Sequence, residues 1–301
     1  MEGNSTFTPA NMGGPIGQGR NGTVYVKKVD GDDVAIKFFK NVEFFTNELK
    51  FLKLCDFDEV IKIKFHEHLI IATHLMPGGS LQERLIDKSL DTKDRNLIAI
   101  ILATGFEKMH NIGVAHRDIK PLNVVLDQYN RPKIIDMEFA CFFEHGITGE
   151  VGTRFFMAPE VKYTNKYNEK CDVYSFGVLL FMLLCNKIDP KGFMDISSYP
   201  DCPSYTKELI KMCIDIDPNK RPSFSQIVEG MGQQGNLFEN TPKPSLTNVL
   251  LRRTAPIIKP NSHKRNNKII SQKTNIMTAN QKSPCITKKQ RATSKNIMEN
   301  P

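Results

Sequence analysis

Apolar and polar positions alternate over several short segments in the first quarter of the chain. Val, Ile, Tyr and Phe recur in residues 24–29 (VYVKKV) and 32–39 (DDVAIKFF), and again in 61–65 and 68–76. Such runs of β-branched and aromatic residues are typical of strands. Residues 43–55 instead place apolar side chains three and four positions apart, which predicts a helix with one buried face.

Longer apolar patterns follow in the second half of the folded region. Residues 96–113 predict a buried helix that ends at Gly113. Residues 172–185 are apolar nearly all round, so this helix is expected to be central, and residues 204–216 predict a further amphipathic helix. Strands first and helices afterwards indicate an α+β protein with two lobes.

Composition and charge divide the chain unevenly. It has 301 residues, 40% of them hydrophobic and 25% charged, which suits a globular core with room for more than one lobe. Residues 233–301 carry a net charge of +11, whereas residues 1–232 carry −3. No aromatic residue follows Phe238, so we expect this basic tail to bury too little apolar surface to fold. Residues 1–12 are polar, do not resemble a signal peptide and are expected to be flexible.

The tail permits two interpretations that the sequence leaves open. Its charge suits an acidic partner, including nucleic acid, and its basic clusters at 252–253, 264–265 and 288–291 would also serve nuclear import. The alternative is a solvated linker that binds nothing specific.

Cysteine usage and apolar run length indicate the compartment. The seven cysteines are scattered and form no CxxC pair, which favours reduced thiols in a cytoplasmic or nuclear protein. The longest apolar run, residues 174–185, is shorter than the ~20 residues of a membrane helix. We therefore expect an intracellular protein without a membrane partner.

A glycine-rich segment precedes the first long strand. Residues 16–24 read IGQGRNGTV, with Gly17, Gly19 and Gly22 spaced as G-x-G-x-x-G ahead of Val24. Glycines let the backbone approach phosphate oxygens, although a flexible turn would have the same composition. Because a strand rather than a helix follows, a dinucleotide-binding turn is disfavoured.

Lys37 closes the apolar segment VAIK, where its charge must find an anion or reach solvent. It either extends to water at a sheet edge or clamps nucleotide phosphates while held by an acid from the next helix. Glu48 is the preferred acid because Leu49 and Leu52 mark the buried side of that helix. Glu43 is the competitor, but its place near the helix start is explained by the helix dipole.

Polar residues also gather in front of a later apolar run. Residues 115–127 read AHRDIKPLNVVLD, and residues 133–140 read KIIDMEFA. These groups sit either on a solvated turn or around a phosphate.

Five motifs, taken in their order along the chain, favour the phosphate site over the solvated turn. They are Gly17–Val24, Val34–Lys37, His116–Asn123, Asp136 and Ala158–Glu160. Together they resemble the eukaryotic protein kinase family, with its G-x-G-x-x-G-x-V, V-A-I-K, H-R-D-x-x-x-x-N, Asp and A-P-E motifs. The resemblance implies a bilobal kinase domain over residues 13–232, with a small antiparallel sheet and one helix over about 13–75 and a mainly helical lobe over about 76–232.

The resemblance also implies a Ser/Thr protein kinase that uses ATP and Mg²⁺. Asp118 would accept the proton of the substrate hydroxyl, and Lys120 would neutralise the γ-phosphate. Asn123 and Asp136 would hold Mg²⁺, a cation that prefers oxygen ligands. Lys37 would bind the α- and β-phosphates.

Further matches concern specificity and structure. In this family Lys120 and Thr153 mark Ser/Thr rather than tyrosine kinases. Glu160 and Arg221 resemble the family's buried ion pair, and Asp172 resembles the helix-start Asp that binds the backbone of the catalytic loop.

The adenine site is expected at the segment HLMPGGSL. Thr73, just before it, resembles the gatekeeper, and Leu75 and Met76 would offer backbone hydrogen bonds. The residues expected to sandwich the adenine ring are Ile16, Val24, Ala35 and Leu126.

One motif departs from the family. Asp136-Met137-Glu138 stands where Asp-Phe-Gly is usual. Met is flexible enough to fill the slot of Phe, but Glu should restrict the loop and adds a carboxylate near the metal. Either the loop is active-like with Glu138 pointing outward, or the metal site is distorted and the chain is a pseudokinase scaffold. The presence of the expected catalytic and metal residues favours activity.

The activation segment suggests regulation. Arg117 precedes Asp118, and Thr148 is the one hydroxyl residue between Glu138 and Gly152. We expect Thr148 to be phosphorylated and to pair with Arg117, unless Glu144 or Glu150 substitutes for the phosphate.

The short core also fits a reduced kinase, of viral or divergent eukaryotic origin. The net negative charge of residues 1–232 favours basic protein substrates.

Overall fold

The computed structural model describes residues 7–144, 146–164, 166–189, 195–197 and 203–233. The chain divides into two units, Met1–Gly232 with Cys285–Pro301, and Gln233–Pro284. The account below concerns the first unit. The predictions for the tail after residue 233 lie outside the described residues.

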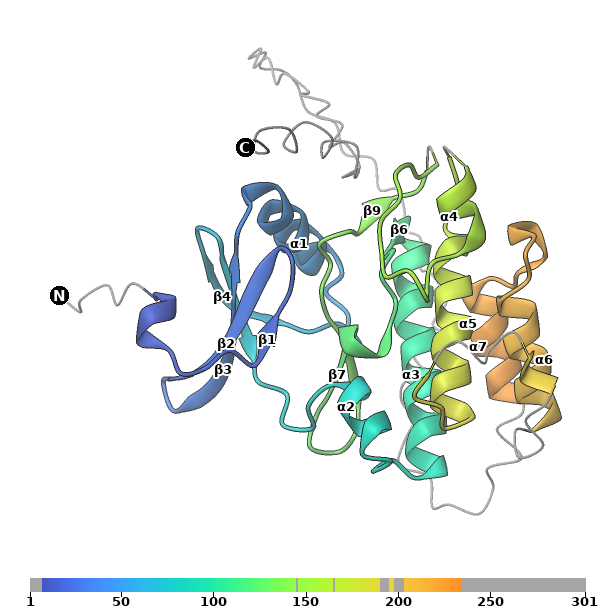
Figure 1. Ribbon diagram of the computed structural model, residues 1–301, viewed down its shortest axis with the longest axis horizontal. Coiled ribbons are helices and arrows are strands. Elements are labelled where there is room, and N and C mark those ends of the chain that lie inside the picture. The colour runs from blue at the N-terminus through green and yellow to red at the C-terminus, as the bar shows by residue number, and fades with distance from the viewer. Residues whose placement is uncertain (1–6, 145, 165, 190–194, 198–202, 234–301) are drawn as a thin grey trace, which may run out of the picture. The chain divides into compact units, whose positions relative to one another are not determined.

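A five-stranded antiparallel sheet with strand order β1-β2-β3-β5-β4 forms the first lobe (Figure 1). Its strands are β1 (Gly17–Gln18), β2 (Gly22–Val29), β3 (Asp32–Phe39), β4 (Ile63–Glu67) and β5 (Ile70–His74). Helix α1 (Val42–Leu54) follows β3 and starts at Asn41, whose side chain accepts the N–H of Glu43. Both the strands and the helix agree with the periodicity of the sequence.

The outer face of this sheet has its own small core, made by Val34, Ile36, Ile70 and Ala72. Phe7 and Met12 pack against it, and the Phe7 ring stacks on Phe65 with centroids 5.1 Å apart. Residues 7–12, expected to be flexible, therefore cover part of the sheet and include the 3₁₀ helix η1 (Pro9–Asn11). Sequence analysis missed the packing of Phe7 and Met12 because the segment is polar overall.

The second lobe is mainly helical (Figure 1). Its helices are α2 (Leu81–Ile86), α3 (Thr92–Asn111), α4 (Pro159–Tyr163), α5 (Lys170–Leu184), α6 (Ser204–Cys213) and α7 (Phe224–Gln233). Residues Cys171–Leu183 of α5 are all buried, as its apolar sequence predicted. This helix forms the centre of the lobe and packs against α3 and α6.

Two short strand pairings flank the polar motifs of this lobe. Strand β6 (Val114–Ala115) pairs with β9 (Cys141–Phe142), and β7 (Val124–Leu126) pairs with β8 (Pro132–Ile134). The 3₁₀ helices η2 (Pro121–Asn123) and η4 (Pro218–Lys220) connect other elements. The expected α+β fold with two lobes is thereby confirmed. No helix in the described part of the chain is long and apolar enough to cross a membrane.

Candidate active site

Strand register places the expected nucleotide-binding side chains on one face of the first sheet. Val24 lies opposite Lys37, and Thr73 lies opposite Ala35. Because cross-strand partners and alternate residues share a face, these four side chains point the same way. Leu126 belongs to the other lobe and is fully buried.

The glycine-rich segment forms the turn between β1 and β2. Gly17 pairs with Val24, and the N–H of Gly19 donates to the carbonyl of Gly22 at 2.9 Å. A Cβ on Gly22 would lie 2.7 Å from the carbonyl oxygen of Phe38, so only glycine fits there. Ile16, expected above the adenine ring, is 58% exposed.

Lys37 joins three elements. Its Nζ donates to Glu48 Oε2 at 2.6 Å and to Asp136 Oδ1 at 2.8 Å. Glu48 is buried on α1, whereas Glu43 is exposed in the first turn of the helix. The structure therefore brings together Lys37 and the acid that the sequence preferred.

The carboxylates around Lys37 shift one another's ionisation. Burial raises the pKa of Glu48 to about 8, and burial together with the charge of Asp136 raises the pKa of Glu138 to about 7. Burial also opposes ionisation of Asp136, but the Lys37 ammonium holds the pKa of that carboxyl below its ordinary value. Three carboxyl groups thus share one ammonium, and Glu48 and Glu138 bind a proton more readily than a free carboxyl does.

The loop that precedes β7 is anchored by Asp172 at the start of α5. The Asp172 carboxylate accepts the N–H of His116 at 2.7 Å and that of Arg117 at 2.8 Å, and it contacts His110 Nε2 at 3.0 Å. Arg117 has a φ of +70°, a conformation that non-glycine residues adopt only when their surroundings impose it. The buried Asp172 supplies that constraint.

Asp118 is held at the end of this loop. Its Oδ2 accepts from Lys120 Nζ at 2.6 Å, and its Oδ1 accepts from Thr153 Oγ1 at 2.8 Å. Lys120 Nζ also donates to Thr153 Oγ1 at 2.8 Å. The three residues predicted from the motifs therefore form one hydrogen-bonded group, with Asp118 only 4% exposed.

The β7–β8 pairing places Asn123 beside Asp136. Val124 lies opposite Ile134, and the N–H of Ile135 donates to the carbonyl of Asn123 at 3.0 Å. Asn123 Nδ2 donates to Asp118, and no hydrogen bond to Asn123 Oδ1 or Asp136 Oδ2 occurs among the described residues. These two oxygen atoms suit a hard cation such as Mg²⁺, so the residues present fit that ion.

The variant positions after Asp136 both point inward. Met137 is fully buried and belongs to the main core, so it fills the slot that Phe would occupy. Glu138 is 9% exposed, and its Oε2 lies 3.7 Å from Lys37 Nζ. The interpretation in which Glu138 points outward is therefore wrong for this structure.

Two asparagines with no assigned role in the motifs contact this segment. Asn47 Nδ2 on α1 lies 3.4, 3.0 and 2.9 Å from the carbonyls of Met137, Glu138 and Ala140. Asn21 Nδ2, from the glycine-rich turn, donates to Glu138 Oε1 at 2.9 Å. Sequence analysis missed both residues because isolated asparagines in a turn and on a helix carry no local signal for such distant contacts.

The segment after β5 differs in one detail from the expectation. The N–H of Leu75 donates to the carbonyl of Asp33 at 3.0 Å, so it does not offer that group to an adenine ring. The sheet ladder, which continues one residue past the end of β5, uses this donor. The carbonyl of Met76 accepts from Gly79 at 3.1 Å, and the Gly78 N–H donates to Leu126.

Glu160, in the first turn of α4, and Arg221, at the end of η4, form an ion pair with two hydrogen bonds. Arg221 Nη1 and Nη2 lie 2.6 and 2.8 Å from the two carboxylate oxygens of Glu160. The Arg221 side chain has no exposed surface, and its guanidinium also donates to the carbonyls of Asp215 and Lys170. The pair that the sequence indicated is thus the centre of a buried network.

Arg117 contacts the segment around Thr148 through the backbone. Its Nη2 donates to the carbonyls of Thr148 and Gly149 and to the hydroxyl of Tyr167, at 2.9, 3.1 and 2.9 Å. The Thr148 residue itself is exposed. A phosphate on Thr148 would have to compete with these carbonyls for Arg117, so phosphorylation there stays a prediction.

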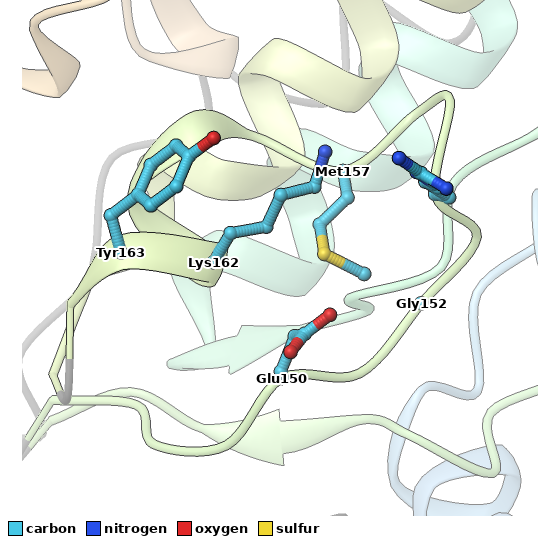
Figure 2. A pocket seen from close by; sticks show the side chains of 6 residues that line it. Glu150, Gly152, Met157, Lys162 and Tyr163 are labelled. Carbon is cyan, nitrogen blue, oxygen red and sulfur yellow. The ribbon is translucent and has the colours of Figure 1, made fainter.

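A cavity of about 390 Å³ lies next to the catalytic loop (Figure 2). Its lining residues are Glu150, Gly152, Arg154, Met157, Lys162 and Tyr163. A Cβ built on Gly152 would lie 3.7 Å from Asp118 Oδ1, so the cavity adjoins the candidate catalytic carboxylate.

Gly152→Ala is expected to lower turnover by roughly 10- to 100-fold, because misplaced catalytic groups lose rate steeply. Gly152 has a φ of +107°, and a Cβ there would lie 2.6 Å from the carbonyl oxygen of Arg117. The methyl group would push the segment that carries Thr153 away from Asp118. Steady-state kinetics would measure the loss. Gly232→Ala, with nothing within 4 Å of its Cβ, is the matched control. Equal activity of the two variants would contradict the expectation.

Comparison with known proteins decides the family. The family model of the protein kinase domain matches residues 11–231. This chain belongs to the eukaryotic-type protein kinase family. Residues of the kinase domain are 33% identical over 248 residues to a probable LIM domain-containing serine/threonine-protein kinase of Dictyostelium discoideum. That match covers 72% of this chain and 38% of the relative.

Two other relatives from Dictyostelium discoideum are similar to the same kinase domain. A dual specificity protein kinase is 30% identical over 254 residues, covering 72% of this chain and 35% of the relative. A probable serine/threonine-protein kinase is 30% identical over 257 residues, covering 77% and 42%. The chain thus spans less than half the length of these relatives. The resemblance found in the motifs is confirmed.

Proposed function

We propose that this protein is a serine/threonine protein kinase that transfers the γ-phosphate of ATP to protein hydroxyls. The observation that carries the proposal is the arrangement of Asp118 between Lys120 and Thr153, with the Lys37–Glu48 pair facing Asp136. Phosphoryl transfer depends mainly on positioning and charge neutralisation, and these residues supply both.

Different residues bind the phosphates, the metal ion and the adenine ring of the nucleotide. Lys37 binds the α- and β-phosphates, and the backbone of the glycine-rich turn lies over them. The oxygens of Asn123 and Asp136 hold Mg²⁺, which when bound neutralises charge on the phosphates. The apolar side chains of Val24, Ala35 and Leu126, together with Ile16, enclose the adenine ring. Met76 supplies the backbone contact to that ring.

The reacting groups act around Asp118. Its carboxylate accepts the proton of the substrate hydroxyl as the oxygen forms a bond to the γ-phosphorus and the bond to ADP breaks. Lys120 stabilises the charge on the transferred group, and Thr153 orients Asp118 through its hydroxyl. Asp118 and Asn123 are almost fully buried, which limits the access of water to the reacting groups.

Transfer of label from γ-labelled ATP to a generic basic protein tests the proposal. We expect incorporation on Ser and Thr that is lost when EDTA removes divalent metal and returns with added Mg²⁺. An acidic substrate assayed beside the basic one would test the preference inferred from charge, since the cavity carries Arg154 and Lys162 as well as Glu150. Label mainly on Tyr would contradict the assigned specificity, and label that resists EDTA would contradict the metal assignment.

A second candidate function is a kinase-like scaffold with little catalysis. The inward position of Glu138 beside Lys37 favours it, because a carboxylate there repels phosphates. Absence of transfer by a protein that nevertheless binds nucleotide would support this candidate.

A nucleic-acid or other acidic partner for residues 233–301 rests on their charge alone. Loss of salt-sensitive nucleic-acid binding on truncation at residue 232 would support it.

A further inference from the structure

Asn21 connects the glycine-rich turn to the loop that follows Asp136. It lies between β1 and β2, and its side chain turns inward, leaving the residue 7% exposed. Its Nδ2 donates to Glu138 Oε1 at 2.9 Å across a sequence separation of 117 residues. A hydrogen bond thus joins the two lobes at the point where the proposed phosphates must enter.

Glu138 is fixed from two sides. Its carboxylate is held by Asn21, and its backbone carbonyl accepts from Asn47 Nδ2 at 3.0 Å. The same carboxylate reaches to within 3.7 Å of Lys37 Nζ. Both partners of the Asn21–Glu138 bond are more than nine-tenths buried, so solvent competes little with it.

This arrangement places a third carboxylate at the ammonium group that binds phosphates in the proposed function. Glu48, Asp136 and Glu138 each have an oxygen within 4.8 Å of the others, with Lys37 among them. A phosphate that approached Lys37 would compete with the Glu138 carboxyl group for the same ammonium. The two anions therefore exclude each other.

We propose that Asn21 and Glu138 form a latch across the phosphate site, and that this pair determines the affinity for nucleotide phosphates. When a nucleotide binds, Glu138 leaves Lys37, its bond to Asn21 breaks, and the glycine-rich turn is released to cover the phosphates. The latch rests on the proposed function, since it assigns the phosphates to Lys37. A hydrogen bond to a charged acceptor is worth roughly tenfold or more in an equilibrium constant, and that factor sets the size of the effect.

Calorimetric titration of the full-length chain tests the latch with two probes: the Mg²⁺ complex of a non-hydrolysable ATP analogue, and adenosine, which lacks phosphates. We expect Asn21→Ala to tighten binding of the analogue about tenfold, the factor of a lost bond to a charged acceptor, and to leave adenosine within about twofold. Glu138→Gln keeps an oxygen that accepts from Asn21 but removes the charge, so it should also tighten the analogue. The free-energy gain in analogue binding of the double variant should be smaller than the sum of the two single gains, because both substitutions weaken the same latch.

Matched controls are Asn111→Ala at the exposed end of α3 and Glu67→Gln at the exposed end of β4, which should change neither affinity. Weaker binding of the analogue by Asn21→Ala would overturn the latch, because the pair would then support bound phosphates. Equal shifts for adenosine and the analogue would also overturn it. If the wild type binds the analogue but transfers no phosphate, the proposed function fails while the latch is still judged by affinity. If neither the wild type nor any variant binds nucleotide, both proposals are wrong.

Discussion

Asp118→Asn should lower phosphate transfer by roughly 10²- to 10⁴-fold, the usual contribution of a general base, and leave nucleotide affinity within about twofold. The amide is isosteric, and its oxygen still accepts from Lys120 Nζ, which lies 2.6 Å from the present carboxylate. Its NH₂ group then faces Thr153, whose hydroxyl can accept instead of donate. The fold and the substrate site are therefore retained while the proton acceptor is lost.

The measurement for this variant is single-turnover transfer from labelled ATP, with the dissociation constant of the nucleotide determined separately. Asp87→Asn, at the exposed C-terminal end of α2, makes the same chemical change away from the site. We expect it to match the wild type. If Asp118→Asn kept more than a tenth of the wild-type rate, Asp118 would not be the base. A loss of nucleotide affinity equal to the loss of rate would indicate a binding role instead.

Arg221→Met is expected to destabilise the kinase domain by about 3–5 kcal/mol, because removing one partner of a buried pair leaves the other charge uncompensated. The Arg221 side chain has no exposed surface, and the Glu160 side chain is only 9% exposed. The carbonyls of Asp215 and Lys170 would lose their donor as well. Urea unfolding, followed by circular dichroism, would measure the change in the free energy of unfolding.

Two further variants give this stability prediction its control. Glu160→Gln combined with Arg221→Met should be more stable than Arg221→Met alone, since the stranded charge is gone. Arg131→Met breaks the exposed pair with Asp127 and should cost about 0.5 kcal/mol or less. A cost for Arg221→Met as small as that of Arg131→Met would show that the buried pair does not hold the second lobe together.

The spacing of apolar residues predicted most of the helices and strands, because residues that are buried on the same face recur with the period of the element. The long strands β2 and β3 and the helices α1, α3 and α6 carry apolar stripes that the local sequence displays, and α5 is apolar nearly all round. Helix α2 was missed although Ser80 and Glu83 form a reciprocal N-terminal cap, because the helix has only six residues. The cover that Phe7 provides for the outer sheet face was also missed, since an isolated aromatic in a polar segment has no period.

In the candidate site, too, local sequence patterns predicted some contacts and missed others. Glu48 could be chosen over Glu43 because helix geometry distinguishes a buried face from an exposed first turn. The direction of the Glu138 side chain could not be foreseen, because it depends on Asn21, far away in sequence. The use of the Leu75 N–H by the sheet depended on strand register, which apolar alternation does not specify past the end of a strand.

The Asn47 amide has a consequence for how this kinase domain moves. A single side chain bridges α1 to the carbonyls of Met137, Glu138 and Ala140, so the helix cannot swing outward unless the metal-binding loop follows it. We therefore expect the two segments to move together. A compound that requires this loop to reverse its direction would therefore have to break the Asn47 hydrogen bonds, and we expect it to bind this kinase domain weakly. Compounds confined to the adenine side do not require the two segments to move.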